Sequence, residues 1–290
     1  MRVSHLFTPM KALLLTLLTA ASACASTVAD HLGLQMYSLR AMAAKDGWRS
    51  AMDQAKAFGF TYIEGSGPPK GITMEAFKAD QAALGLTEIS AGVDYGSLGK
   101  DLAGEVSLVK SLGCKYAMIA WIPHSDKDGF NEAEAKKAIE DFNTWGAAFK
   151  AEGISLVYHA HGYEFRPLAN GDTLFDMIAR ETNPEFINFE MDVFWITHGG
   201  QDPAKLLAKY PDRWKMMHVK DIRKGAPTGL YTGHAPATDD VAVGSGQVDW
   251  PSVLKEAQAV GVQWYFIEDE SETPLENIPK SVAYIKSLGL

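Results

Sequence analysis

Acidic and histidine side chains recur at the ends of four apolar segments in the second half of the chain. In chain order these ends are Tyr158-His159-Ala160-His161, Glu190-Met191-Asp192-Val193, Met217-His218-Val219-Lys220 and Phe266-Ile267-Glu268-Asp269. Carboxylates and imidazoles are costly to bury unless they are paired or bound to a cation. If the four ends lie side by side, a divalent metal ion is the simplest reason for gathering such groups.

The elements that would bring these ends together are short apolar segments that alternate with longer helical patterns. The predicted strands are 31–38, 61–66, 87–93, 116–122, 155–161, 186–193, 215–221 and 263–269. The predicted helices are 47–58, 74–84, 102–112, 132–151, 173–180, 203–209, 251–260 and 275–288. Several helical patterns end in glycine, as at Gly85 and Gly113, which is a helix stop signal.

Eight strand–helix pairs in one chain predict an α/β fold, a single (β/α)₈ TIM barrel. The alternative is an open doubly wound sheet, which would normally offer a glycine-rich first turn if it bound a dinucleotide. The turn after the first strand is instead Leu39-Arg40-Ala41-Met42. The barrel is therefore the preferred fold, and its active site would lie at the carboxyl ends of the strands.

Strand alternation predicts which side chains point into the barrel. Glu190 and Asp192 share one face of their strand, and the apolar face opposite must meet the outer helices. The same rule places His218, Lys220 and Glu268 inward on the next two strands. Each residue alone also has an ordinary structural role, so it is the joint pattern that favours a metal site. Glu190, for example, could be an acceptor that only orients a ligand.

The N-terminus has the pattern of a cleavable signal peptide. Arg2 and Lys11 precede an apolar stretch at 12–21, which is followed by the small residues Ser22-Ala23-Cys24-Ala25. The prediction is a signal peptide at 1–25 and one barrel domain at 26–290, which makes the protein periplasmic or secreted. The apolar stretch is too short to span a bilayer, which needs about 20 residues. A lipid-modified Cys24 or a short anchor is the less favoured alternative.

The net charge of the chain restricts the classes of partner that it can bind. The formal net charge is −9, which argues against nucleic acid and against anionic membranes as partners. The chain has two cysteines, and removal of Cys24 with the signal peptide would leave Cys114 without an intramolecular partner. We therefore expect a fold held by its hydrophobic core, and the composition is compatible with an oligomer.

Several motifs resemble those of the sugar phosphate isomerase/epimerase family in the xylose isomerase-like TIM barrel superfamily. They occur along nearly the whole of 26–290, at Leu32-Gly33-Leu34-Gln35-Met36-Tyr37-Ser38-Leu39, Tyr158-His159-Ala160-His161 with Glu164-Phe165, Glu190-Met191-Asp192-Val193-Phe194-Trp195 with Gly199-Gly200 and Asp202-Pro203, His218-Val219-Lys220-Asp221, and Gly244-Ser245-Gly246 with Val248-Asp249-Trp250. As a signal of fold this resemblance is strong. As a signal of substrate it is weak, because one barrel hosts many chemistries.

The resemblance implies a divalent metal ion held by residues from strands five to eight. Asp192, His218 and Glu268 match three of the ligand positions, and Glu164 or His161 would be the fourth. Mixed oxygen and nitrogen ligands suit Mn²⁺, Co²⁺ or Zn²⁺ better than Mg²⁺.

The resemblance also implies proton abstraction next to a sugar carbonyl, with the metal stabilising the charge that develops. His161 and Glu164 are the candidate bases, Glu268 is a further catalytic candidate, and Lys220 would stabilise the oxyanion. The residues expected to line the substrate pocket are Gln35, Tyr37, Glu64, Trp121, His124, His159 and Trp195. Each aromatic residue among them could equally be packed in the core.

Export and charge both bear on the substrate. Sugar phosphates are cytosolic, and the predicted strand ends carry no basic cluster beyond Lys220, whereas phosphate normally needs arginine pairs or helix N-termini. The expected function is a metal-dependent isomerase or epimerase of an unphosphorylated sugar or keto-sugar.

Two alternatives stay open at this point. The first is a metal-dependent lyase or hydrolase of oxidised (3-keto) glycosides, and the second is a non-catalytic sugar-binding barrel. Asp192, His218 and Glu268 speak against a mere binder, which would not need them. The segment 225–240, rich in Gly, Pro and Thr, is expected to be a lid or an interface loop.

Overall fold

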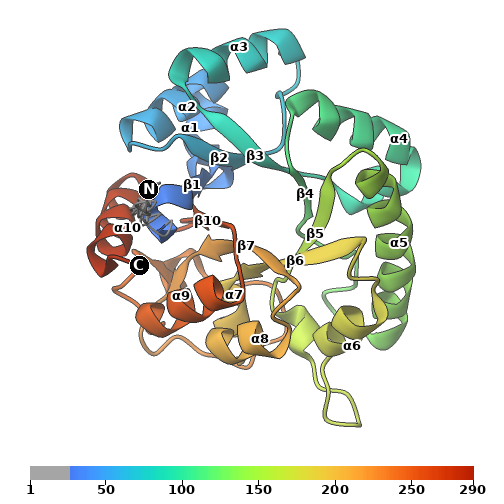
Figure 1. The fold of residues 1–290 in the computed structure, drawn as a ribbon. Coiled ribbons are helices and arrows are strands. Elements are labelled where there is room, and N and C mark those ends of the chain that lie inside the picture. The colour runs from blue at the N-terminus through green and yellow to red at the C-terminus, as the bar shows by residue number, and fades with distance from the viewer. Residues whose placement is uncertain (1–26) are drawn as a thin grey trace, which may run out of the picture.

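The computed structural model describes residues 27–290, which form a closed barrel of eight parallel strands (Figure 1). Around the barrel the strands follow the order β1-β10-β7-β6-β5-β4-β3-β2. Their bounds are β1 Leu32–Gln35, β2 Tyr62–Gly65, β3 Thr87–Gly92, β4 Tyr116–Ile119, β5 Ser155–His159, β6 Ile187–Asp192, β7 Trp214–Val219 and β10 Trp264–Ile267. The predicted (β/α)₈ barrel and all eight of its strands are confirmed. The predicted signal peptide at 1–25 lies outside the described residues.

The helices surround the barrel (Figure 1). They are α1 Arg40–Asp46, α2 Trp48–Ala57, α3 Met74–Leu84, α4 Tyr95–Leu112, α5 Glu132–Ala151, α6 Leu174–Glu181, α7 Val193–His198, α8 Pro203–Lys209, α9 Trp250–Ala259 and α10 Pro274–Leu288. Eight of these correspond to predicted helices, whereas α1 and α7 were not predicted. Both lie at the carboxyl end of the barrel and replace an expected loop: α7 follows β6 directly, and the short 3₁₀ helix Met36–Leu39 separates α1 from β1.

Two apolar layers hold the fold together. The larger one lies between the strands and the helices and includes Met217 and Val219. The smaller one fills the interior of the barrel and consists of Ile89, Tyr116, Met118, Val157, Met216, Trp264 and Phe266. Alternate residues of β7 therefore go to opposite layers, as the strand period requires. Gly33 on β1 has no side chain because a Cβ there would lie 2.6 Å from the ring of Phe266.

Polar residues replace this interior packing at the carboxyl ends of the strands. The change occurs within single strands, as from Met216 to His218 on β7 and from Phe266 to Glu268 just after β10. A short antiparallel ribbon, β8 Asp221–Ile222 with β9 Asp240–Val241, anchors the 225–240 segment beside these ends. Of the helices in 27–290, none combines the length and apolar character needed to cross a bilayer.

Candidate active site

A buried cluster of carboxylates and imidazoles lies at the carboxyl ends of the strands. Two groups of three residues, His159 with Glu190 and His218, and Asp192 with His218 and Glu268, each offer ligand atoms within 4.8 Å of one another. All five residues are buried. The structure thus brings Asp192, His218 and Glu268 together, as the sequence predicted. Their roles as metal ligands stay predictions.

His218 occupies the centre of the cluster. Its Nε2 lies 2.6 Å from Glu64 Oε1 and 3.3 Å from Glu190 Oε2, and its Nδ1 lies 3.2 Å from Glu268 Oε2. Burial alone would lower the pKa of this imidazole, but Glu190, Glu268 and Glu64 outweigh burial and raise the pKa well above its usual value. In the metal-free chain His218 therefore serves as the local counter-cation for several carboxylates.

His159 is the second imidazole of the cluster. Its Nδ1 lies 3.1 Å from Glu190 Oε2, and its Nε2 lies 3.7 Å from Asp192 Oδ2. Burial, together with the neighbouring His218 and His161, holds the pKa of His159 well below its usual value. A neutral imidazole is the form that binds a metal, so His159 is a ready ligand. The sequence had placed it only in the substrate pocket.

Lys220 links the buried cluster to Glu270, which lies closer to the surface. Its Nζ donates to Glu268 Oε2 at 3.2 Å and also to Glu270. Burial would lower the pKa of Lys220, but Glu268 and Glu270 raise it well above the usual value, so the ammonium stays charged. In turn Lys220 and His218 outweigh burial and hold the pKa of Glu268 well below its usual value.

The donor set fits a divalent cation. Within the described part of the chain, Glu64 Oε2, Glu190 Oε1 and Asp192 Oδ2 are buried and have no hydrogen-bond partner. Burial and the neighbouring Glu64 raise the pKa of Glu190 well above its usual value, which shows how crowded with negative charge the cluster is. Unpartnered buried carboxylate oxygens are costly, and a bound cation would satisfy them. Oxygen and nitrogen donors together suit Mn²⁺, Co²⁺ or Zn²⁺.

Glu164 lies apart from this cluster. Its carboxylate accepts hydrogen bonds from the Tyr158 hydroxyl and from the backbone N–H of His161, the latter at 3.0 Å, and it belongs to neither candidate group. Gly162 adopts a left-handed conformation (φ 92°) and begins the short 3₁₀ helix Tyr163–Phe165, which turns Glu164 toward the outward face of β5. Burial raises the pKa of Glu164 to about 7. This geometry does not support Glu164 as the fourth ligand or as the base.

His161 keeps the position expected for a catalytic base. Its ring lies between the aromatic walls of the site, with centroids 5.7 Å from Trp121 and 5.3 Å from Trp195. Burial, and secondarily the charge of Lys220, lowers the pKa of His161 to about 3. The ring is therefore neutral near pH 7, with a free nitrogen lone pair but lowered basicity.

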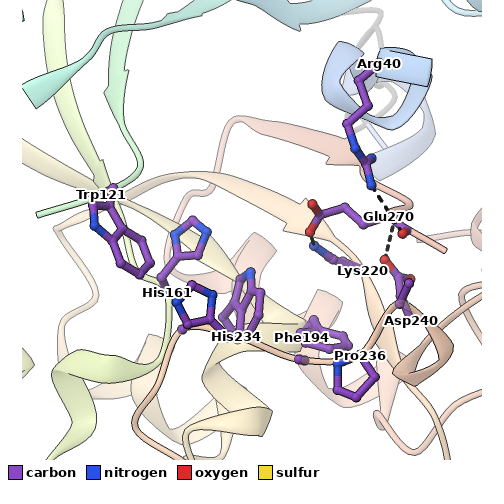
Figure 2. A pocket seen from close by; sticks show the side chains of 13 residues that line it. Arg40, Trp121, His161, Phe194, Lys220, His234, Pro236, Asp240 and Glu270 are labelled. Carbon is purple, nitrogen blue, oxygen red and sulfur yellow. Dashed lines mark hydrogen bonds and ion pairs between the residues drawn. The ribbon is translucent and has the colours of Figure 1, made fainter. Parts of the chain in front are cut away.

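Two adjoining cavities lie at the barrel mouth. The larger, of about 500 Å³, lies over the cluster and is lined by His159, His218 and Glu268. The smaller, of about 330 Å³, adjoins it, and Figure 2 shows side chains that line the smaller one. Trp121, His161 and Glu270 line both. Each volume is within the range of small-molecule sites.

The predicted pocket residues take different places. Gln35, Tyr37, Trp121 and His159 line the larger cavity, and Trp195 lines the smaller. Glu64 lies beneath the cavities, where it accepts from Gln35 Nε2 at 2.6 Å as well as facing His218. His124 lines neither cavity, because its Nδ1 lies 2.7 Å from the Ile122 carbonyl oxygen and its ring packs on Trp121.

Sequence reasoning missed several residues of the smaller cavity. These are Arg40, Phe194, His234, Pro236 and Asp240, which Figure 2 shows around the Lys220–Glu270 pair. His234 and Pro236 belong to the 225–240 segment, which therefore forms a wall of the site. The Gly, Pro and Thr content of that segment was the only signal in the sequence.

The chain belongs to the xylose isomerase-like TIM barrel family, which it matches over residues 52–288. It is 26% identical over 212 residues to an inosose dehydratase of Mesomycoplasma hyopneumoniae strain J, covering 65% of this chain and 69% of the relative. An inosose dehydratase of Salmonella agona is 30% identical over 179 residues, which are 57% of this chain and 58% of the relative. A crystal structure of a sugar phosphate isomerase/epimerase from Parabacteroides distasonis superposes with a TM-score of 0.71 at 26% identity and covers 87% of this chain and 96% of that one.

These matches confirm the resemblance that the motifs suggested. The family is one of sugar-modifying enzymes, and its members commonly bind divalent metal ions.

Proposed function

We propose that the protein abstracts a proton next to the carbonyl of an unphosphorylated keto-sugar, with a divalent metal ion in the His218 cluster. The observation that carries this proposal is the group of buried, unpartnered carboxylate oxygens directly beneath a sugar-sized cavity. Asp192, His218 and Glu268 would hold the ion, with His159 or Glu190 completing the set. When bound, the ion would polarise the carbonyl and stabilise the negative charge that develops on its oxygen.

The chain's own residues supply the remaining steps. Neutral His161 faces the cavity and can accept the proton. Lys220 stays protonated and can donate a hydrogen bond to developing negative charge. Trp121 offers an aromatic wall against which a sugar face can pack.

The charges around the cavities favour a substrate without phosphate. Lys220 is already neutralised by Glu268 and Glu270. Arg40 donates to the carbonyl oxygens of Tyr37 and Glu270, so its guanidinium is partly engaged. Phosphate sites normally present an arginine pair or a helix N-terminus. The signal peptide predicted at 1–25 agrees with this, and we place the protein in the periplasm or outside the cell.

Two fates of the deprotonated substrate define two activities. Return of the proton at the same or the adjacent carbon gives an isomerase or epimerase. Elimination instead breaks the C–O bond at the β carbon, forms a C=C bond, and sends a proton to the departing oxygen. The sequence relatives are dehydratases, which supports elimination as the second candidate.

The experiment is metal analysis of the purified protein, followed by NMR of keto-sugars and 3-keto-glycosides incubated with the metal-loaded protein in D₂O. Deuterium incorporation without cleavage would indicate an isomerase or epimerase, and new alkene signals would indicate a lyase. Glu268→Gln should abolish both, whereas Glu276→Gln, exposed on α10, should leave them unchanged. A metal-free protein that binds sugar, or a metal-loaded protein that gives neither exchange nor cleavage, would refute the proposal and favour a sugar-binding barrel.

A further inference from the structure

We propose that the smaller cavity binds a second unit of the substrate, so that the substrate is a keto-glycoside rather than a free keto-monosaccharide. The reacting ring would occupy the larger cavity, and the group joined to it through the glycosidic oxygen would occupy the smaller. The chemistry at the reacting ring rests on the proposed function, whereas the second binding position rests on the geometry of the cavity itself.

The two cavities differ in whether residues of the carboxylate and imidazole cluster line them. The larger is lined by His159, His218 and Glu268 of the cluster, whereas none of the five cluster residues lines the smaller. The smaller cavity, of about 330 Å³, is thus not needed to reach the cluster. It nevertheless adjoins the larger one, because Trp121, His161 and Glu270 line both, so a molecule bound in one cavity lies against residues of the other.

Three residues that line the smaller cavity carry unpartnered polar atoms. Of the atoms described, Trp195 Nε1, Asp240 Oδ1 and His161 Nδ1 are buried and have no hydrogen-bond partner. They offer a donor, an acceptor, and a nitrogen that can be either. Buried polar groups without partners are uncommon and each costs free energy, which indicates that a ligand satisfies them.

The aromatic walls of the same cavity suit the apolar face of a sugar ring or an aryl group. Trp121 and Phe194 contribute aromatic rings to the lining of the cavity (Figure 2). Flat apolar rings next to isolated donors and acceptors suit a molecule with apolar faces and polar edges. A phosphorylated group fits poorly, because Lys220 on the same wall is already paired with Glu270 and Glu268, and burial raises the pKa of Asp240 well above its usual value.

A chain of ion pairs marks the boundary between the two positions. Lys220, which lines the smaller cavity, donates to Glu268 in the larger one and to Glu270, which borders both. The oxygen that joins the two units would lie at this boundary, within reach of a charged donor. The boundary therefore suits a glycosidic linkage.

The test measures binding without turnover. Affinities of the metal-loaded full chain for glucose, maltose, cellobiose and the phenyl α- and β-glucosides are measured by calorimetry. We expect at least one glycoside to bind tenfold or more tightly than glucose. In Trp195→Phe, which keeps a ring but removes Nε1, the affinity for that glycoside should fall roughly fivefold through loss of one hydrogen bond, and glucose should be unaffected. Trp48→Phe is the matched control, because Trp48 Nε1 is also buried and unpartnered but lies away from both cavities on α2.

Equal affinities for glucose and all the glycosides, an unchanged glycoside affinity in Trp195→Phe, or an equal loss for glucose in that variant would overturn the assignment. The outcome is independent of the D₂O experiment. Glycoside binding without exchange or cleavage would refute the proposed function alone. Exchange on a keto-monosaccharide without any gain for glycosides would refute the second binding position alone.

Discussion

The two carboxylate oxygens of Asp192 have different roles, and a suitable substitution removes one role and keeps the other. Its Oδ1 accepts from the backbone N–H of Trp195 at 2.8 Å and caps α7, while its Oδ2 is buried without a partner and belongs to the ligand group. Asparagine caps helices about as well as aspartate. Asp192→Asn should therefore keep the cap and change the stability of the metal-free chain by less than about 1 kcal/mol.

The metal-dependent part of the stability should respond strongly to the same substitution. An ion present at a hundred times its dissociation constant stabilises the folded state by about 2.7 kcal/mol. If the loss of the Asp192 carboxylate weakens binding about a hundredfold, the same concentration contributes only about 0.4 kcal/mol. For a domain of this size the metal-induced rise in Tm should shrink from about 5–10 °C to about 1 °C.

The assay is thermal unfolding of chelator-treated protein with and without Mn²⁺. Asp202→Asn is the matched control, because the exposed Asp202 caps α8 through Lys205 N at 3.1 Å and lies outside the cluster. Asp192→Ala should lose both the metal response and about 1 kcal/mol of metal-free stability, since alanine cannot cap. A full Mn²⁺ response in Asp192→Asn would show that Asp192 is not a ligand.

Further substitutions test other features of the molecule. Burial raises the pKa of Glu88 from its usual 4.5 to about 7, so stability is lost as the pH rises from about 4.5 to about 7. Above pH 7, Glu88→Gln should therefore be more stable than the wild type by up to about 3 kcal/mol in urea unfolding. Gly233 has φ 68° and a Cβ there would lie 2.9 Å from the Trp121 ring, so Gly233→Ala should raise KM several-fold by displacing the 225–240 wall. Glu164→Gln should leave the Mn²⁺-induced Tm rise intact, and His161→Gln should lower turnover about 10²–10⁴-fold without changing that rise.

Each of these substitutions has a control or a contradicting result. Glu75→Gln changes an exposed carboxylate on α3 and should leave the pH dependence of unfolding unchanged. Gly229→Ala has the same backbone strain (φ 77°) with no neighbour within 4 Å, so an equal KM change there would count against the Trp121 contact. Loss of the Mn²⁺-induced Tm rise in Glu164→Gln would indicate that Glu164 is a metal ligand. Normal turnover in His161→Gln would show that His161 is not the catalytic base.

The sequence by itself determined the barrel and the inward faces of its later strands. The period of two is local, so apolar partners such as Met217 on one face assign His218 to the other without any knowledge of neighbouring strands. Glycine stop signals are equally local, and α3 and α4 end at Gly85 and Gly113 as predicted. Motif resemblance supplied the expectation of a metal, and the clustering of Asp192, His218 and Glu268 agrees with it.

Only the tertiary structure decided which other groups meet these three. Glu164 follows β5 closely in sequence, yet the left-handed Gly162 turns it to the outward face, where Tyr158 binds it. Glu64 lies on β2, which β1 and β10 separate from β7, and it reaches His218 because the closed barrel brings inward side chains of non-adjacent strands together. Asp240 reaches the site through the β8–β9 ribbon. Such contacts depend on the closure of the barrel and on the direction that each loop takes, and local patterns of residue type do not encode either of these.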